Sequence, residues 1–230
     1  MGNIDYSKLA EITVRTQAEL DEIPQNFKGR IYINCGANDW IKIRHSYYYP
    51  VVVKGNSSVV VCVFPPVVNV FPDFPTVEAY ENSYVVANDN SSVRVYDNAY
   101  VEAYDNSYVE AYDNSYVEAY ENSHVRAYEN SSVLAKENSY INAFDNSYVM
   151  TRDNSSVRAF DNSFVEAFNH STVGAFENSS VKAYEYVAVR AYGNSSVRAY
   201  GNAQVVDFLQ GASIKVFDNA RIVSCDLKIV

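Results

Sequence analysis

Hydrophobic and polar residues follow an eight-residue pattern over most of this chain. Seventeen units run without a gap from Val77 to Ala212, and the unit beginning at Val101 reads VEAYDNSY. Looser copies begin at Val51, Val59 and Val67, and two more begin at Ile214 and Ile222. We number the positions of this octad from one, the Val, to eight, the second Tyr.

The octad predicts one β-strand and one turn. From position seven to position four of the next copy, Ser, Val and Ala alternate with aromatic or polar residues, which is the period of a strand. The Asp-Asn pair at positions five and six interrupts this alternation, and both residue types favour turns. Each octad therefore predicts a strand of about six residues followed by a tight corner.

The inner face of these strands must be the one that carries Val, Ala and Ser. Position two holds Glu102, Arg126 and Lys182, so its face, which also carries the Tyr rows, must contact water. A unit this short buries its apolar face only by stacking on its neighbours, which predicts a parallel β-solenoid. Such small inward residues would leave voids in a wide three-stranded coil, and voids are costly. We therefore predict an all-β fold, a two-sided β-roll with about sixteen residues per coil.

The distribution of side chains between alternate octads supports two strands per coil. At position four, one set of alternate octads is entirely aromatic from Tyr80 to Phe208, whereas the other set is mixed. At position two, the first set begins Glu78, Arg94, Glu110, Arg126, an alternation of sign that stacked neighbours favour. A coil of about 24 residues would mix these rows. About eleven coils spaced at about 4.8 Å predict a rod of roughly 50 Å.

Three regions are expected along the chain: a small α/β cap over residues 1–50, the octad solenoid over 51–212 and capping strands over 213–230. Thr16–Glu19 predicts a capping box that opens a helix through about Ile23, and Gly29–Asn34 predicts the first strand. Asn at position six predicts ladders of stacked side-chain amides along the corners. The remaining features are Trp40 in the cap, an irregular join at Pro65, Pro66, Pro72 and Pro75, a register slip of one residue at Ser213, and a last strand at Leu227–Val230.

Composition narrows the classes of function. The net charge of −10 and the isoelectric point near 4.7 argue against direct binding of nucleic acid. The 21 Tyr residues, placed on the outer face, are expected to be largely exposed. The three Cys, an odd number, argue against a disulfide framework and favour a reducing compartment. The N-terminus lacks the pattern of a secretion signal, and no apolar run reaches the length of a membrane span. We expect a cytoplasmic protein of the host cell or a virion-associated one, with no membrane partner.

Catalysis has little support in the sequence. His45, His124 and His170 are far apart, and no nucleophile is paired with a base. The abundant carboxylates belong to the repeat, so we expect no enzyme, no cofactor and no dedicated metal site. Calcium binding at the acidic corners stays open, because stacked Asp-rich corners bind calcium in some β-rolls.

Charge along the repeats is uneven. Residues 77–124 carry ten acids and one base, whereas residues 125–212 carry nine acids and seven bases. Exposed Tyr residues are typical of protein interfaces. We therefore expect a partner-binding surface in the acidic part, made by Glu102, Asp105, Glu110, Asp113, Glu118 and Glu121 together with Tyr104, Tyr108, Tyr112, Tyr116 and Tyr120.

In architecture and acidity, this Tyr-rich acidic solenoid resembles the pentapeptide-repeat DNA mimics and the anti-CRISPR-type inhibitors of phages, although its repeat is an octad. The resemblance implies a non-enzymatic inhibitor that occludes a basic nucleic-acid-processing protein. The alternative is a phage fibre or surface adhesion module whose Tyr rows bind glycan or protein. The identity of the partner, the oligomeric state and the handedness of the coil stay open.

Overall fold

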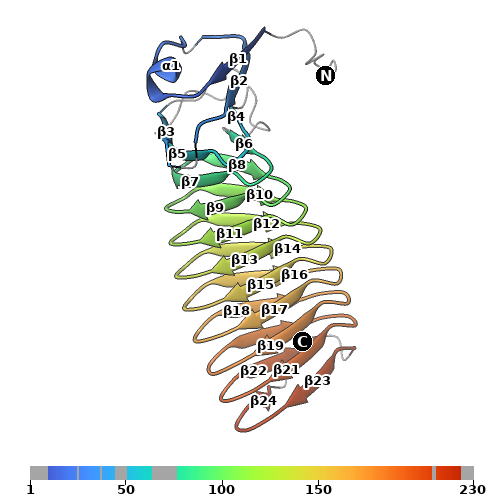
Figure 1. The fold of residues 1–230 in the computed structure, drawn as a ribbon. Helices are drawn as coiled ribbons and strands as arrows, with labels where there is room; N and C mark the ends of the chain where they lie inside the picture. The colour runs from blue at the N-terminus through green and yellow to red at the C-terminus, as the bar shows by residue number, and fades with distance from the viewer. Residues whose placement is uncertain are drawn as a thin grey trace.

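The chain forms a parallel two-sided β-solenoid, seen from the side in Figure 1. The structure is a computed structural model that describes residues 10–24, 26–36, 38–44, 51–63, 77–208 and 211–223. After the first two strands, which share one sheet, its strands alternate between a 13-stranded sheet, which we call sheet A, and an 11-stranded sheet, which we call sheet B. This arrangement confirms the predicted fold class.

All strands of each sheet run parallel to their neighbours. Sheet A contains β1 (Ala10–Val14), β2 (Gly29–Ile33), β4 (Val51–Val53), β6 (Val77–Ala79), β8 (Ser92–Val95), β10 (Tyr108–Ala111), β12 (His124–Ala127), β14 (Tyr140–Ala143), β16 (Ser156–Ala159), β18 (Thr172–Ala175), β20 (Ala188–Ala191), β22 (Gln204–Asp207) and β24 (Arg221–Ile222). Sheet B contains β3 (Trp40–Ile43), β5 (Ser58–Val63), β7 (Tyr84–Asp89), β9 (Tyr100–Ala103), β11 (Tyr116–Ala119), β13 (Ser132–Ala135), β15 (Tyr148–Thr151), β17 (Phe164–Ala167), β19 (Ser180–Ala183), β21 (Ser196–Ala199) and β23 (Ser213–Val216).

The strand register confirms a coil of sixteen residues. Val109 pairs with Val125 on sheet A, and Val117 pairs with Val133 on sheet B. Most strands contain four residues rather than the six expected. The difference arises because positions seven and four lie at the bends, where they still bond to the adjacent coil: the backbone N–H of Tyr104 donates to the carbonyl of Ala87 at 2.8 Å.

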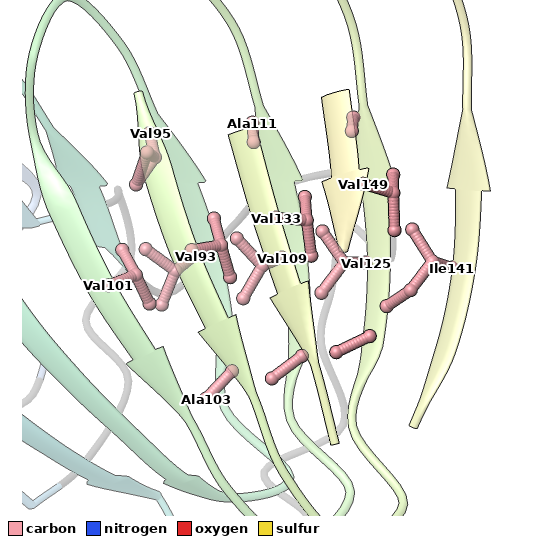
Figure 2. Packing of buried hydrophobic residues seen from close by; sticks show 14 of the residues in the cluster. Val93, Val95, Val101, Ala103, Val109, Ala111, Val125, Val133, Ile141 and Val149 are labelled. Atoms are coloured by element: carbon pink, nitrogen blue, oxygen red, sulfur yellow. The ribbon is translucent and has the colours of Figure 1, made fainter. Parts of the chain in front are cut away.

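The core consists of the Val, Ala and Ser residues that the alternation predicts. Val101, Ala103 and Ser107 are fully buried, and equivalent residues of nearly every octad are buried too. Figure 2 shows how the Val side chains of the two sheets meet in a single layer between them. Because this core is a single thin layer, small residues are enough to fill the interior of a two-stranded coil.

The N-terminal region begins both sheets and adds one helix. As predicted, Thr16 forms a capping box with Glu19, and α1 spans Gln17–Asp21, ending two residues before Ile23. The strand expected at Gly29 is present, but it is the second strand because β1 precedes it and pairs with it. With thirteen strands in sheet A at about 4.8 Å, the rod is about 58 Å long, slightly longer than expected.

At the C-terminal end, Ser213 pairs with Ser196, seventeen residues away, which confirms the predicted register slip. The irregular join at Pro65–Pro75, the copy beginning at Val67 and the strand expected at Leu227–Val230 lie outside the described residues.

Candidate partner-binding surface

The predicted partner-binding residues are divided among both faces and both edges of the roll. Sheet B carries Glu102, Tyr104, Tyr116, Glu118 and Tyr120, whereas sheet A carries Tyr108, Glu110 and Tyr112. The corners hold Asp105 and Glu121 on one edge and Asp113 on the other. Residues eight apart in sequence thus lie on opposite faces, and a single flat partner contacts only one part of this set.

On sheet B, tyrosines and glutamates form a hydrogen-bonded network. The hydroxyl of Tyr100 donates to Glu118 at 2.9 Å, and that of Tyr104 donates to Glu102 at 2.9 Å. Glu118 also accepts from the hydroxyl of Tyr120 and from the ammonium of Lys136, the latter at 3.1 Å. Glu102 and Glu118 are register neighbours, so these donors offset the repulsion between two adjacent like charges.

The network shifts the titration of its members. Burial raises the pKa of Glu118, but hydrogen bonds from Tyr120, Tyr100 and Lys136 outweigh burial and leave this pKa below its usual value. The pKa of Tyr100 is raised well above 10, first by burial and then by its hydrogen bond to Glu118. Both shifts favour the same state, in which a neutral tyrosine donates to an ionised carboxylate.

On sheet A, acidic and basic side chains alternate at position two of neighbouring strands and form ion pairs. The guanidinium of Arg94 contacts the carboxylate of Glu110 at 2.7 Å, and Arg126 approaches the same carboxylate at 4.0 Å. Burial raises the pKa of Glu110, but the hydrogen bonds from Arg94 and Tyr108 outweigh it, so the net shift is downward. The alternation of sign predicted for stacked octads is therefore confirmed.

An uninterrupted column of nine aromatic rings runs along sheet A at position four. Neighbouring rings are stacked, with centroids 4.6–5.2 Å apart and interplanar angles of 4–12°. We call it the ring column; its members are Tyr80, Tyr96, Tyr112, Tyr128, Phe144, Phe160, Phe176, Tyr192 and Phe208. These rings are half-buried rather than largely exposed as expected, because each ring covers the faces of its neighbours.

The corners have a left-handed backbone at position five. Asp105 has φ of 56° and Asp113 has φ of 55°, and every corner residue of this type from Glu81 to Glu185 has φ between 52° and 62°. This conformation costs a residue other than glycine about 1–2 kcal/mol. An interaction specific to the corner must therefore compensate for the strain.

That interaction is a ladder in which carboxylates accept backbone N–H groups of the preceding coil. The N–H of Asp97 donates to the carboxylate of Asp113 at 3.1 Å, and the N–H of Asp105 donates to Glu121 at 3.0 Å. Most of the neighbouring N–H groups at positions four, six and eight bond to backbone carbonyls of the adjacent coil. The position-five N–H is therefore the donor that needs a side-chain acceptor.

The ladder forms two rows of negative charge, one on each edge of the roll. Row A follows the strands of sheet A and contains Glu81, Asp97, Asp113, Glu129, Asp145, Asp161 and Glu177. Row B follows the strands of sheet B and contains Asp89, Asp105, Glu121, Glu137, Asp153, Asn169 and Glu185. Including Asp218, left-handed corners account for 14 of the 28 acidic residues of the chain.

Sequence reasoning missed this ladder and assigned the corner role to Asn side chains. In the corners that the structure describes, the side-chain acceptors come from position five, whereas the position-six residue contributes its backbone N–H, as Asn106 does to Asp89. The predicted partner-binding set also omits Tyr100 and Lys136, although a comparison of octads two apart places both beside Glu118.

Over the described ranges, no three His, Cys, Asp or Glu side chains are grouped closely enough to hold a metal ion. Within the same ranges, no helix has the length and apolar character that crossing a membrane requires.

Comparison of the chain with protein-family models, with curated proteins and with solved structures finds no match.

Proposed function

We propose that this protein is a non-enzymatic binding protein whose two carboxylate rows occupy the nucleic-acid channel of a basic partner. The observation that carries the proposal is the pair of rows A and B, with their carboxylates held in register along both edges of the rod. The residues that contact the partner are then the corner carboxylates of rows A and B, which include Asp105, Asp113 and Glu121 of the set predicted from the sequence.

The negative charge of the rows exceeds what the fold requires. At Asn169, an amide oxygen accepts the N–H of Asp153 at 3.4 Å, so a neutral side chain also completes the ladder. Asn adopts the left-handed conformation more readily than Glu, yet Glu occupies six corners of rows A and B. Adjacent carboxylates about 4.8 Å apart repel each other by about 1 kcal/mol in water. The charge itself therefore needs an explanation beyond folding.

The spacing of the rows approaches that of a nucleic-acid duplex. Each row places one carboxylate about every 4.8 Å, so the two rows together carry one charge per about 2.4 Å of rod. B-DNA carries one charge per about 1.7 Å. The extended segment between two corners, about six residues when the bend residues on either side of the strand are included, separates the rows by about 20 Å. A cleft lined with Lys and Arg would encounter this field at long range, and its binding would weaken with salt.

The experiment uses the intact protein as bait for host-cell lysate. We expect it to retain a basic nucleic-acid-binding protein that duplex DNA displaces. A fourfold variant, Asp97→Asn, Asp113→Asn, Asp145→Asn and Asp161→Asn, should fold normally and retain much less of that protein, because Asn keeps the acceptor and removes the charge.

A matched control removes four charges from the faces instead: Glu78→Gln, Glu102→Gln, Glu118→Gln and Glu166→Gln. The proposal expects this control to retain the partner better than the corner variant does. Loss of the partner from the face variant alone would move the interaction to the Tyr–Glu network of sheet B. Retention by both variants would contradict any charge-based mechanism.

The second candidate is an adhesion or fibre module that binds through its aromatic rows, favoured by the length of the ring column. Interior rings of the column, such as Phe144, have both faces covered by neighbours, so a ligand meets ring edges and hydroxyls there. If this candidate is right, binding of glycan or protein should survive the corner variant and be lost in a variant that interrupts the ring column, Tyr112→Ala with Tyr128→Ala.

A further inference from the structure

The outer face of sheet A is hollowed around Gly174. In the seventeen uninterrupted octads this is the one position-two residue that is Gly, and its strand neighbours at the same position are Arg158 and Arg190. The position-eight row changes to small side chains in the same place, because Tyr140 is followed by Ser156, Thr172 and Ala188.

A cavity of about 390 Å³ occupies this hollow. Its floor is formed by Ser156, Thr172 and Gly174, and the ring column forms one wall. The ring of Tyr140 closes the N-terminal end, with the guanidinium of Arg158 lying 5.6 Å from its centroid. A cavity of this size accommodates a small organic molecule.

The two arginines of the hollow differ from the other cations near the ring column. Arg94 is paired with Glu110 at 2.7 Å, and Arg126 lies within 4.0 Å of the same carboxylate. Over the described ranges, neither Arg158 nor Arg190 lies within ion-pair distance of a carboxylate, although both line the cavity. Two guanidiniums on either side of an empty position thus lack a counter-charge.

The nearest corner acids are engaged elsewhere. Asp161 accepts the backbone N–H of Asp145 at 3.1 Å, and Glu177 accepts that of Asp161 at 2.9 Å. Along each strand the ring column lies between these corner residues and position two, so the carboxylates belong to the edge of the roll. They add a negative field that an incoming anion must overcome, and the guanidiniums must supply the local attraction.

We propose that the hollow at Gly174 binds a small organic anion with a planar apolar body, such as an aryl phosphate or aryl carboxylate. Guanidinium groups present paired N–H donors that match the oxygens of phosphate and carboxylate. Since their strands lie two spacings apart, about 9.6 Å, Arg158 and Arg190 can reach one anion between them. The missing side chain at Gly174 leaves room for the body of the ligand against the edge of Phe176.

The apolar part of the site explains why a bare ion is not the best ligand. A Cβ atom added at Gly174 would lie 2.9 Å from the Cε2 atom of Phe176, so this ring leans over the glycine. Rings of Tyr140, Phe160 and Tyr192 complete an aromatic surround. Edge-to-face contacts with these rings stabilise a planar ligand beyond its charge.

The test is calorimetric titration of the full-length protein with phenyl phosphate, alongside inorganic phosphate. We expect phenyl phosphate to saturate one site per chain and to bind at least about tenfold tighter than inorganic phosphate. Arg158→Gln and Arg190→Gln should each weaken binding about tenfold or more, because each removes charged hydrogen bonds to the anion. Gly174→Leu should abolish binding by filling the hollow.

Matched controls lie on the same sheet outside the hollow. Asn142→Leu fills position two one octad pair before Arg158, and Arg126→Gln removes a cation there; both should leave the affinity unchanged. Leu134 shows that the octad tolerates Leu at position two, and circular dichroism checks the fold of each variant. The proposal is overturned if phenyl phosphate fails to saturate below about 10 mM, or if the hollow variants bind as the wild type does. Equal affinity for inorganic phosphate would overturn the aromatic part of the site.

Discussion

The corners of this rod are nearly uniform along its length, whereas its faces change. From Glu81 to Glu185 every position-five residue has the same left-handed backbone, and nearly all carry a carboxylate in the same ladder. The faces differ between the two halves: Glu102 and Glu118 lie within a Tyr network on sheet B, and Arg158 and Arg190 flank a hollow on sheet A.

This difference separates two origins of charge in one chain. Side-chain acceptors repeat at the corners because every coil presents the same position-five N–H, so the regularity of the acceptors, though not their charge, follows from the backbone. Face residues have no such requirement, since position two accepts Glu, Arg, Leu, Met or Gly with the same strand geometry. The net charge of −10 is thus largely a property of the edges, and the faces carry local sites of either sign.

The largest expected effect is loss of the fold at alkaline pH. Its cause is the ionisation of tyrosines on the faces of the roll. Folded-state pKa values above 10 mean that the tyrosines stabilise the fold fully below pH 10 and lose this contribution as pH rises through the folded values. Burial, followed by the charge of Glu110, raises the pKa of Tyr112 to about 12.

Tyrosinate absorbance and circular dichroism, recorded together between about pH 9 and 13, check this prediction. We expect the tyrosines whose pKa is raised, among them Tyr100, Tyr104 and Tyr112, to ionise above pH 10, together with loss of the β signal. Ionisation near pH 10 in a protein that stays folded would show that the Tyr–Glu network is not formed.

At the corners, the free energy of unfolding should depend more on the presence of a side-chain acceptor than on its charge. Asp113→Ala removes the acceptor of the Asp97 N–H and places Ala in a left-handed conformation, so it should reduce the free energy of unfolding by about 1–2 kcal/mol. Asp113→Asn keeps the acceptor and should cost less than about 0.5 kcal/mol. Denaturant unfolding measures both, and equal losses would mean that the charge stabilises the corner.

On their interior side the corners differ from one another in the hydrogen bonding of the position-seven Ser. The hydroxyl of Ser131 donates to the carbonyl of Tyr128 at 2.7 Å, whereas the buried hydroxyl of Ser107 has no partner within the described structure. Ser131→Ala should therefore cost about 1 kcal/mol, and Ser107→Ala should be neutral or stabilising. Ala99 and Ala203 already occupy this position in other octads. Thermal unfolding of the two variants distinguishes these corners, and equal costs would indicate the same hydrogen bond in both.

The smallest change in the free energy of unfolding is expected from a substitution at the end of row A. Gly193 occupies position five without a carboxylate, so it offers no side-chain acceptor to the N–H of Glu177. A Cβ atom at Gly193 would lie 3.6 Å from that nitrogen, which is ordinary contact. Gly193→Asp should extend the ladder and stabilise by about 0.5–1 kcal/mol, the hydrogen bond minus the strain of φ 62°.

Gly201 provides the matched control, because a Cβ atom there would lie 3.1 Å from the backbone nitrogen of Glu185. The same substitution should gain less at this tighter position. Denaturant unfolding measures the effect of Gly193→Asp. Destabilisation would show that the ladder hydrogen bond does not offset the strain of the left-handed backbone.

The sequence alone was enough to predict the coil, but it did not reveal the corners. Inward Val, Ala and Ser, together with the aromatic row from Tyr80 to Phe208, required two strands per coil. The ladder was hidden because it depends on the direction of the position-five N–H, which follows from φ and not from residue type. The candidate surface around Glu102–Glu121 was contiguous in sequence, yet each octad step reverses the face, so its members are dispersed in space.

The central claim is that the corner rows present charge to a partner beyond their role in the fold. The measurement that tests it most directly is the salt dependence of affinity for the DNA-displaced partner, compared between the wild type and the fourfold corner Asn variant. We predict a steep fall of affinity with salt for the wild type and a much shallower one for the variant at an unchanged melting temperature. Equal salt slopes, or a wild-type protein that retains no DNA-displaced partner, would contradict the claim.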